Sequence, residues 1–495
     1  MRAVELLQAV RYEPAGEKIR FPDREISGVS IDSRDCREGS VFVCIRGSVC
    51  NGSRYAKEAV RHGAKVLVAA KEEQELIGKI LGQFPECEGV LVEDEREAAA
   101  LLAARYEGEP SRSMTMIGVT GTKGKTTTVS MIRKILSEAG IRTGMIGTTG
   151  QFDGKEHLPS EHTTPDAVTL QRSLARMRKN ACRACVMEVS SQALKLQRTK
   201  GICFDTGVFL NLGDDHIGRF EHADKEEYLA CKRKLFLQSR EAVVNADDPA
   251  WKQMLAGTEC PFQTFGIRNG DFRAVKIRTE SFVQGHPGVE FDIGKVHFQI
   301  PAPGIFTVYN ALAAVRVCMQ YGVTPKTAAG SLLDFQVKGR MQFFSIPGGG
   351  EAVIDYAHNA MSLESVLTTL RAYRPARLIT VFGCGGQRAK ERRFQMGEVS
   401  GRLSDLTVIT SDNPRWEAPE AIMDDIETGV RKTDGKYLRI TDRKEAVKQA
   451  VEMAGPGDLV VIAGKGHENT QEIQGVFYRM DEQELVEEAC TQKLL

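Results

Sequence analysis

The chain has 495 residues and carries 66 acidic and 66 basic side chains. Its length exceeds what one hydrophobic core organises and suits about three domains. Because the formal net charge is zero, no global field favours nucleic acid or a membrane surface, so local lysines, arginines and loop amides must hold any anionic substrate.

The twelve cysteines are scattered and form no framework of a small secreted fold, which favours reduced thiols. The first 14 residues lack a basic segment followed by an apolar one, and no apolar run approaches the ~20 residues that span a bilayer. We expect a cytoplasmic protein without membrane insertion. Cys182 and Cys185 form a CxxC pair, which we interpret as a helix end entering a buried strand rather than a redox or zinc site.

The first predicted domain covers residues 1–108. It contains three strand-like runs, SVFVCIRG, AKVLVAA and GVLVED, between helical stretches. The polar, proline-containing segment GEPSRSM that follows predicts a linker to the next domain.

Two further domains are predicted, at residues 109–338 and 339–495. The second has apolar runs ending in MEVSS, NLGDDH and NADDP, followed by a strand-rich part near residues 260–300. The third has apolar runs ending in DYAHN, GCGG, TSDNPR and GKGHE. Strands alternating with helices give mostly parallel sheets, with ligands at the carboxyl ends of the strands. We therefore expect an α/β fold, with a P-loop ATPase-like central sheet and a Rossmann-like last domain.

The stretch TMIGVTGTKGKTTTVSMI, residues 115–132, joins an apolar strand to a glycine-rich loop and an amphipathic helix. Gly121 and Gly124 let the backbone curl with its amides inward, and Lys125 adds a cation where β- and γ-phosphates would sit. Thr126 offers a hydroxyl to Mg²⁺. The pattern predicts a nucleoside triphosphate site.

This loop departs from the generic P-loop, because Val119 stands where that motif needs glycine. The form GTKGKTT resembles the ATP loop of the Mur ligases and their folylpolyglutamate synthetase relatives, which join an amino acid to a carboxylate through an acyl phosphate. A P-loop nucleotide switch without ligase activity is the alternative from another class.

Polar groups end three strands of the central block: Glu188 in MEVSS, Asn211 and His216 in NLGDDH, and Asn245 with Asp247 in NADDP. A carboxylate and an imidazole near the loop threonine can hold Mg²⁺. DDH alone is more often a helix cap. The resemblance favours the Mg²⁺ site over the helix cap, since these three segments recur in Mur ligases in this order.

The segment YLACKRKLF predicts a helix with basic residues 232–234. By itself it favours a solvated basic face. In Mur ligases the lysine four residues after a tyrosine is carbamylated and helps hold a second Mg²⁺, and Lys232 with Tyr228 matches that pattern. The interval from His216 is slightly longer than is usual in the family.

Over nearly the whole chain, the sequence is similar to the tripeptide-forming Mur ligases, which implies UDP-N-acetylmuramoyl-dipeptide, ATP and an amino acid as substrates and Mg²⁺ as cofactor. Catalytic roles fall on Lys125, Glu188, His216 and Lys232. Magnesium contacts fall on Thr126, Glu188, His216 and carbamylated Lys232. ATP contacts fall on Gly121, Thr122, Lys123, Gly124, Lys125, Thr126, Thr127, Asn310, Arg340, Asp355 and His358. Contacts to the UDP-substrate fall on Ser33, Thr163, Thr164, Ser190 and Arg198.

The incoming amino acid is expected to be meso-diaminopimelate, because arginine's planar fork suits its far carboxylate better than a lysine would. The resemblance places the contacts on Arg388, Asp412, Asn413, Pro414, Arg415, Gly464 and Glu468. Glu468 would pair with the substrate's ammonium. A DNPR that merely caps the turn before the next helix is the alternative interpretation.

Several positions depart from the family pattern: Asn51, Ser53, Gln192, Leu196, Gln387 and residues 359–361. None of these positions is among the predicted phosphate- or metal-binding residues. An L-lysine-adding, pentapeptide-forming or otherwise divergent Mur ligase therefore stays an alternative. We expect a monomer with no nucleic-acid partner.

Overall fold

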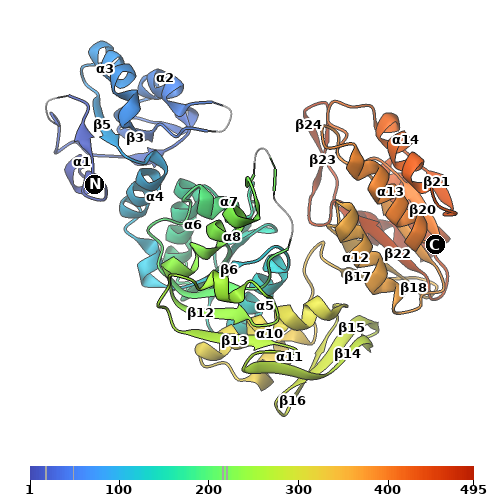
Figure 1. Cartoon of the computed structure of the whole chain (residues 1–495). Coiled ribbons are helices and arrows are strands. Elements are labelled where there is room, and N and C mark those ends of the chain that lie inside the picture. The colour runs from blue at the N-terminus through green and yellow to red at the C-terminus, as the bar shows by residue number, and fades with distance from the viewer. Residues whose placement is uncertain (17–18, 48–49, 214–216, 219–220, 495) are drawn as a thin grey trace. The chain divides into compact units, whose positions relative to one another are not determined.

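The computed structural model describes residues 1–494 except 17–18, 48–49, 214–216 and 219–220. The chain divides into two compact units. Figure 1 labels the helices and strands. The first comprises Met1–Arg273 and Tyr309–Ala328, and the second comprises Ala274–Val308 and Ala329–Leu495. Among the described residues, no helix is both long and apolar enough to cross a membrane.

The N-terminal part of the first unit is a five-stranded sheet in the order β1-β5-β4-β3-β2, parallel except for β1. Its strands are β1 (Glu13–Pro14), β2 (Gly28–Ser30), β3 (Ser40–Val43), β4 (Ala64–Ala70) and β5 (Glu88–Val92). Its helices are α1 (Ala3–Leu7), α2 (Ala56–Arg61), α3 (Gln74–Gln83) and α4 (Glu95–Tyr106). The three strand-like runs of the sequence became β3, β4 and β5, as expected.

The predicted linker is partly ordered. Pro110–Ser113 form a 3₁₀ turn in which Pro110 and Ser111 are buried. The Arg178 guanidinium donates to the carbonyl oxygens of Glu107 and Gly108, each at 2.8 Å, and so fixes the segment to the central part of the same unit. Polar composition alone did not reveal this anchoring.

The central part is built on parallel strands in the order β13-β12-β11-β6-β10-β7, with β8 and β9 added antiparallel beyond β7. These strands are β6 (Thr115–Thr120), β7 (Thr143–Gly147), β8 (Gly150–Phe152), β9 (His157–Leu158), β10 (Ala184–Glu188), β11 (Phe204–Phe209), β12 (Ser239–Asn245) and β13 (Phe262–Gly266). The helices are α5 (Lys125–Glu138), α6 (Ala167–Lys179), α7 (Ser191–Lys195), α8 (Lys225–Arg233) and α9 (Trp251–Met254). Apolar side chains of β6, β10, β11 and β12 pack into one core, and β6, β10 and β11 are buried at consecutive residues, as in a sheet covered on both faces.

The cysteines agree with the prediction of reduced thiols and of a CxxC pair that lies between a helix end and a buried strand. All twelve are unpaired. Cys182 follows α6 and Cys185 lies in β10, so the CxxC does run from a helix end into a buried strand. Burial raises the pKa of the Cys185 thiol, which makes it a poor nucleophile.

The strand-rich part expected near residues 260–300 links the two units. Strand β14 (Phe272–Val283) begins in the first unit and continues in the second, where it pairs antiparallel with β15 (His286–Ile293), which pairs with β16 (Val296–Ile300). Helices α10 (Ile305–Gln320) and α11 (Pro325–Leu332) each cross the same division of the chain.

The C-terminal part of the second unit is a six-stranded sheet in the order β17-β18-β22-β19-β20-β21, parallel except for β17. Its strands are β17 (Gln342–Ile346), β18 (Gly350–Asp355), β19 (Leu378–Phe382), β20 (Leu406–Ile409), β21 (Tyr437–Arg439) and β22 (Leu459–Ala463). A hairpin of β23 (Thr470–Ile473) and β24 (Val476–Arg479) follows.

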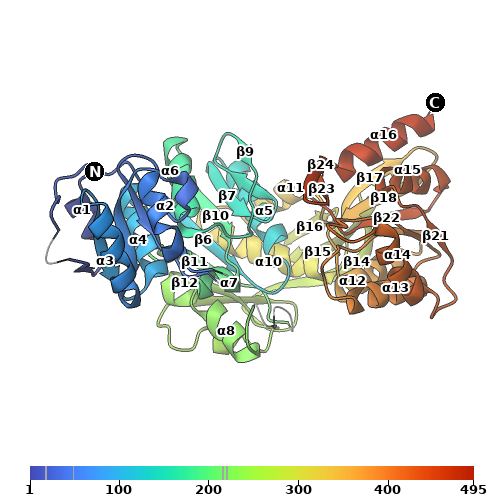
Figure 2. The ribbon, with the colours of Figure 1, turned by 90° about the horizontal axis from the view of Figure 1, so that it is seen from above.

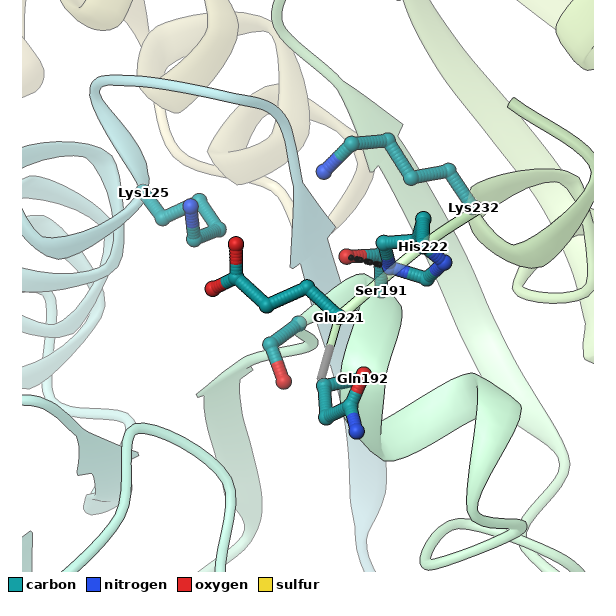
Figure 3. Close-up of a pocket in the computed structure, with 7 residues that line it drawn as sticks. Lys125, Ser191, Gln192, Glu221, His222 and Lys232 are labelled. Carbon is teal, nitrogen blue, oxygen red and sulfur yellow. Dashed lines mark hydrogen bonds between the residues drawn. The ribbon is translucent and has the colours of Figure 1, made fainter. Parts of the chain in front are cut away.

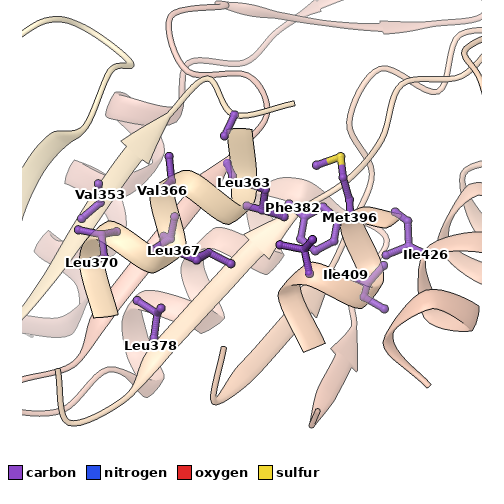
Figure 4. Close-up of a cluster of buried hydrophobic side chains, with 14 of the residues drawn as sticks. Val353, Leu363, Val366, Leu367, Leu370, Leu378, Phe382, Met396, Ile409 and Ile426 are labelled. Carbon is purple, nitrogen blue, oxygen red and sulfur yellow. The ribbon is translucent and has the colours of Figure 1, made fainter. Parts of the chain in front are cut away.

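Helices cover both faces of this sheet (Figure 2). One face carries α12 (Ala360–Arg371), α13 (Glu391–Leu403) and α14 (Pro419–Val430), and the other carries α15 (Arg443–Met453) and α16 (Glu482–Leu494). Leu367 of α12, Phe382 of β19 and Met396 of α13 meet in the larger cluster (Figure 4). This packing explains why the strands are continuous apolar runs.

Candidate active site

The phosphate loop connects β6 to α5, as the sequence predicts. Gly124 has φ +85°, and a Cβ there would lie 2.4 Å from Asn310 Oδ1, so only glycine fits. Asn310 of α10 therefore packs against the loop. The Lys125 ammonium donates to the carbonyl oxygens of Gly121 at 2.7 Å and Thr122 at 3.1 Å, which curls the lysine over the loop. Helix α5 ends at Glu138, two residues before Gly140.

Lys232 of α8 contacts this loop directly. Its Nζ donates to the carbonyl oxygen of Gly121 at 3.0 Å, and the residue is 1% exposed. The same nitrogen lies 4.5 Å from the ring centre of Tyr228, whose hydroxyl is 3.1 Å from Thr122 Oγ1. Burial excludes the solvated basic face for Lys232, although the neighbouring Lys234 is exposed.

Glu188 ends β10 beside the loop strand β6. It is buried, and its carboxylate accepts from the Thr148 amide at 2.8 Å and from the Thr148 hydroxyl at 3.2 Å. Thr148 Oγ1 lies 3.0 Å from Thr163 Oγ1. The next residue, Thr164, donates to the Glu188 carbonyl oxygen at 2.8 Å. The HTTPD segment is thus tied to the end of β10.

The other residues predicted for the muramoyl dipeptide surround Thr164. Its hydroxyl accepts from the Ser190 amide at 3.1 Å, and its carbonyl oxygen accepts from Arg198 Nη1 at 2.6 Å. Ser190 Oγ accepts from the Ala193 amide at 3.1 Å and so caps α7. Thr163, Thr164, Ser190 and Arg198 therefore form one connected group.

A pocket of about 250 Å³ adjoins these groups (Figure 3). Its lining consists of Lys125, Ser190, Ser191, Gln192, Glu221, His222 and Lys232. The Glu221 carboxylate points toward Lys125, and His222 Nε2 lies 2.9 Å from Ser191 Oγ. Three of these residues, Ser191, Glu221 and His222, were missed by sequence reasoning; the EH pair just before α8 was the available signal.

The donor chemistry fits Mg²⁺, a hard cation that prefers oxygen ligands. Thr126, in the first turn of α5, and Glu188, at the carboxyl end of β10, supply such oxygens. Lys232 would supply two more as a carbamate. His216, the remaining predicted ligand, lies outside the described residues.

Asn245 is the last residue of β12 and Asp247 lies just beyond it, and both stabilise the fold through hydrogen bonds. Asn245 Nδ2 donates to the Leu210 carbonyl oxygen at 2.9 Å. Asp247 accepts from the amides of Ile267, Arg268 and Asn269 and from the Tyr309 hydroxyl. Although burial opposes ionisation, these donors outweigh it and lower the pKa of Asp247 to about 2.

Ser33 lies in the N-terminal part, in a 3₁₀ turn capped by Asp32. It is buried, and its hydroxyl donates to Glu58 Oε2 at 3.2 Å. Asn51, one of the departures, accepts from the Ser53 amide at 3.0 Å and donates to Glu73 Oε1 at 2.6 Å. Both departures in this region thus take part in a local turn.

In the second unit, β18, β22, β19 and β20 are neighbours, so the four predicted loops emerge along one edge of the sheet. Asp355, at the end of β18, accepts from the amides of Met341 and Ala357, each at 2.9 Å. Burial raises the pKa of this carboxyl, although Arg340 opposes the rise. The Arg340 guanidinium lies 4.6 Å from the centre of the Tyr356 ring, and the His358 ring lies 4.7 Å from it.

The GKGHE and DNPR loops join through Lys465, a fully buried lysine that sequence reasoning did not single out. Its ammonium donates to Asn413 Oδ1 and Glu468 Oε2, each at 3.0 Å. Asn413 Nδ2 donates to the same Glu468 oxygen at 3.1 Å. Glu468, predicted to pair with a substrate ammonium, already has a protein partner. A Cβ on Gly464 would lie 2.8 Å from Asp412 Oδ2, so these loops touch there too.

Arg415 has φ +54°, a left-handed conformation that costs a non-glycine residue about 1 kcal/mol. Its Nε donates to Glu472 Oε2 at 3.0 Å and its Nη1 to the Gly386 carbonyl oxygen at 2.6 Å. A Cβ on Gly385 would lie 3.2 Å from Arg415 Nη1 and 3.8 Å from Arg388 Cγ, so both predicted arginines flank the GCGG loop. Pro414 approaches the same loop, since a Cβ on Gly386 would lie 2.0 Å from its carbonyl oxygen.

A buried ion pair supports these loops from below. Arg443 and Glu482 are both fully buried in the ion pair that they form. Arg443 also donates to the carbonyl oxygens of Ser411 at 3.2 Å and Ala463 at 2.9 Å, at the starts of the DNPR and GKGHE loops. Because Arg443 and Glu482 are 39 residues apart in the sequence, no local pattern predicts that they pair beneath these loops.

Comparisons with known proteins agree with this architecture. Residues 25–107 match the Mur ligase family catalytic domain, residues 119–318 the Mur ligase middle domain, and residues 339–466 the Mur ligase glutamate ligase domain. The chain is 36% identical to a UDP-N-acetylmuramoyl-L-alanyl-D-glutamate–2,6-diaminopimelate ligase of Clostridium botulinum, over 95% of this chain and 96% of that protein. The enzyme of that name from Syntrophomonas wolfei is 37% identical over all of both chains.

Solved structures show the same likeness. A structure of a UDP-N-acetylmuramoyl-L-alanyl-D-glutamate–2,6-diaminopimelate ligase superposes with a TM-score of 0.68 at 28% identity and covers all of both chains. The fold is shared with MurF ligase from Thermotoga maritima in complex with ADP, at a TM-score of 0.60, 20% identity and coverage of 94% of this chain and 97% of that one.

The chain therefore belongs to the Mur ligase family, a family of ATP-dependent ligases. This confirms the family resemblance, the ligase class and the three-domain α/β architecture expected from the sequence.

Proposed function

We propose that this protein adds meso-diaminopimelate to UDP-N-acetylmuramoyl-L-alanyl-D-glutamate at the expense of ATP, a step in the synthesis of peptidoglycan precursors. The observation that carries the proposal is the similarity, over nearly all of both chains, to ligases named for that reaction. The predicted boundaries at residues 1–108, 109–338 and 339–495 would divide uridine, ATP and amino-acid binding among three domains.

In the proposed reaction, the D-glutamate carboxylate attacks the γ-phosphorus of ATP, giving an acyl phosphate and ADP. The substrate amine then attacks the acyl carbon, loses a proton and expels inorganic phosphate, leaving an amide. The Lys125 ammonium would stabilise charge on the transferring phosphoryl group. Its place over the phosphate loop supports this role.

Other residues of the first unit would bind and orient. The loop residues Gly121, Thr122, Lys123, Gly124, Thr126 and Thr127, with Asn310, would hold ATP; the packing of Asn310 against Gly124 supports this. The group Thr163, Thr164, Ser190 and Arg198 would hold the muramoyl dipeptide, with Ser33 on its uridine end. Mg²⁺ bound by Thr126, Glu188, His216 and carbamylated Lys232 would neutralise phosphate oxygens.

The second unit would bind the amino acid and carry the remaining predicted nucleotide contacts. Arg340, Asp355 and His358 would face the nucleotide. Arg388, Asp412, Asn413, Pro414, Arg415, Gly464 and Glu468 would form the amino-acid site. Their loops emerge from adjacent strands β19, β20 and β22, which supports one shared site.

A divergent ligase with a different UDP-linked substrate is the second candidate. Gln192, a departure from the family pattern, lines the pocket beside Ser190 of the group proposed for the muramoyl dipeptide, so this departure falls where that substrate would bind.

The decisive test measures ADP release and product mass with ATP, Mg²⁺, UDP-N-acetylmuramoyl-dipeptide and meso-diaminopimelate, omitting each substrate in turn. We expect ADP only when both substrates are present, and a tripeptide product. ATP hydrolysis that needs neither substrate would favour a nucleotide switch. Efficient use of L-lysine, or of another acceptor, would favour a divergent ligase.

A further inference from the structure

The hairpin β23–β24 contacts the DNPR loop through both backbone and side chains. The Arg415 amide donates to the Glu472 carbonyl oxygen at 3.1 Å, and the Gln474 amide donates to the Arg415 carbonyl oxygen at 2.7 Å. The Glu472 amide donates to Asn413 Oδ1 at 2.9 Å. Arg415, whose φ is positive, forms an isolated parallel bridge with Ile473 of β23. Strand β23 is therefore paired with the DNPR loop as well as with β24.

The Glu472 side chain adds a charged contact to this backbone pairing. Its Oε2 accepts from Arg415 Nε at 3.0 Å, and the two side chains are 23% and 22% exposed. Partial burial strengthens the pair relative to a surface ion pair. With Nη1 donating to the Gly386 carbonyl oxygen, the guanidinium is held at two of its three nitrogens, and no described residue accepts a hydrogen bond from the third, Nη2.

This geometry separates two roles. Glu468 is engaged by the buried Lys465, whereas Glu472 is engaged by the arginine itself. Arginine has rotamer freedom that costs affinity when a ligand must freeze it, so holding the fork in advance favours binding of a planar carboxylate.

We propose that Glu472 is a positioning residue that holds Arg415 ready for the far carboxylate of the amino-acid substrate. The inference rests on the proposed function and adds a residue to its amino-acid site. Glu472 acts through Arg415 and need not touch the substrate.

The test compares Glu472→Ala and Glu472→Gln with wild type in the full-length protein. The matched control is Glu484→Gln, which removes the carboxylate that pairs with Arg479 at the start of α16. We expect Glu472→Ala to raise KM for meso-diaminopimelate about 10- to 100-fold, with little change in KM for ATP or in kcat. Glu472→Gln should lie closer to wild type, because its amide oxygen still accepts from Arg415 Nε.

A substrate analogue separates positioning from direct contact. 2-Aminopimelate keeps the far carboxylate but lacks the far ammonium, so Glu472→Ala should raise its KM by the same factor. Loss of the effect with this analogue would mean that Glu472 binds the ammonium, and would overturn the inference. In an Arg415→Ala background, Glu472→Ala should have no further effect, and a full multiplicative effect would also overturn it.

Failure of this inference differs from failure of the proposed function. If wild type ligates meso-diaminopimelate and Glu472→Ala has the wild-type KM, only the positioning role is wrong. If wild type does not ligate meso-diaminopimelate, crystal structures still test the role: we expect the Arg415 side chain to leave its wild-type position in Glu472→Ala, and an unmoved side chain overturns the inference.

Discussion

Lys232 Nζ lies 3.0 Å from the carbonyl oxygen of Gly121, so the lysine marked for carbamylation is in contact with the phosphate loop. A carbamate keeps one N–H for that carbonyl oxygen while its two oxygens become available to a cation. Helix α8 and the loop therefore bring the predicted modification site next to the predicted triphosphate site.

We expect Lys232 to carry a carbamate in the active enzyme, because a bare ammonium beside Mg²⁺ would repel the ion. Labelling with ¹³C-bicarbonate should give a carbamate carbon signal that Lys232→Ala lacks. Lys234→Ala, in an exposed position on the same segment, is the control and should keep both signal and activity. A fully active preparation with an unmodified amine would refute the prediction.

Lys125→Ala and Glu188→Ala should each lower turnover at least about 100-fold while the fold is kept, because in the proposed reaction both groups act on the phosphates and their metal. The assay is ADP release with all substrates present, beside circular dichroism of each variant. Lys134→Ala, which removes a surface ion pair with Glu138 on the same helix α5, should be close to wild type. Near-normal ligation by either variant would contradict the prediction that this loop binds the phosphates of ATP.

Arg415→Ala should reduce the preference for meso-diaminopimelate over L-lysine, since only the former carries the far carboxylate. Competition between the two amino acids, with products separated by mass, measures the preference. Arg402→Ala, which breaks a surface ion pair with Glu364, should leave it unchanged. The specificity prediction is wrong if wild type uses L-lysine equally well or if Arg415→Ala keeps its preference.

Asp247 should contribute stability that depends on pH. Its pKa is lowered from 3.8 to about 2 in the folded state, so its contribution is complete above about pH 4 and is lost as the pH falls toward 2. At neutral pH, Asp247→Asn should cost about 1 to 2 kcal/mol, allowing for solvent screening of this half-buried group.

Thermal unfolding from pH 7 down to pH 2 tests this. The difference between wild type and Asp247→Asn should shrink below about pH 4. Asp434→Asn, at an exposed carboxylate of the second unit, should show no such difference. A gap between wild type and Asp247→Asn that stays constant across the range would contradict the prediction.

Leu367→Ala should destabilise the second unit by about 2 to 5 kcal/mol, because it opens a cavity in the cluster beneath α12. Chemical denaturation followed by a probe in this unit gives the value. Thr368→Ala, exposed on the same helix, should change stability by less than about 0.5 kcal/mol. Equal effects of the two substitutions would mean that this cluster does not carry the stability of the unit.

Much of the fold was predictable because apolar runs and loop motifs are local signals. The segments that end in DYAHN, GCGG, TSDNPR and GKGHE became neighbouring parallel strands, and the phosphate loop stands between β6 and α5 as expected. The antiparallel edge strands and the anchored 110–113 turn depend on contacts between distant residues, which periodicity does not encode.

The site was predictable only as far as its motifs reach. Lys125, Glu188 and Lys232 stand in recognisable segments, and the structure places them around the end of β6. Lys465, Glu472 and the Arg443–Glu482 pair were missed, because their importance comes from what they touch. The roles of the predicted site residues remain predictions that the variants above test.

The chain enters the second unit at residue 274, returns to the first unit at residue 309 and enters the second unit again at residue 329. This order affects how the protein folds during synthesis. Residues 274–308 belong to the second unit, where the Tyr373 hydroxyl donates to the Gly288 carbonyl oxygen at 2.6 Å and His286 Nδ1 lies 2.6 Å from Glu351 Oε1. The ribosome releases strands β14 and β15 before Glu351 and Tyr373 are synthesised, so the face of these strands that later packs on the second unit is first exposed to solvent. A fragment that begins at residue 339 would lack these strands, and Tyr373 and Glu351 would lose the contacts with Gly288 and His286.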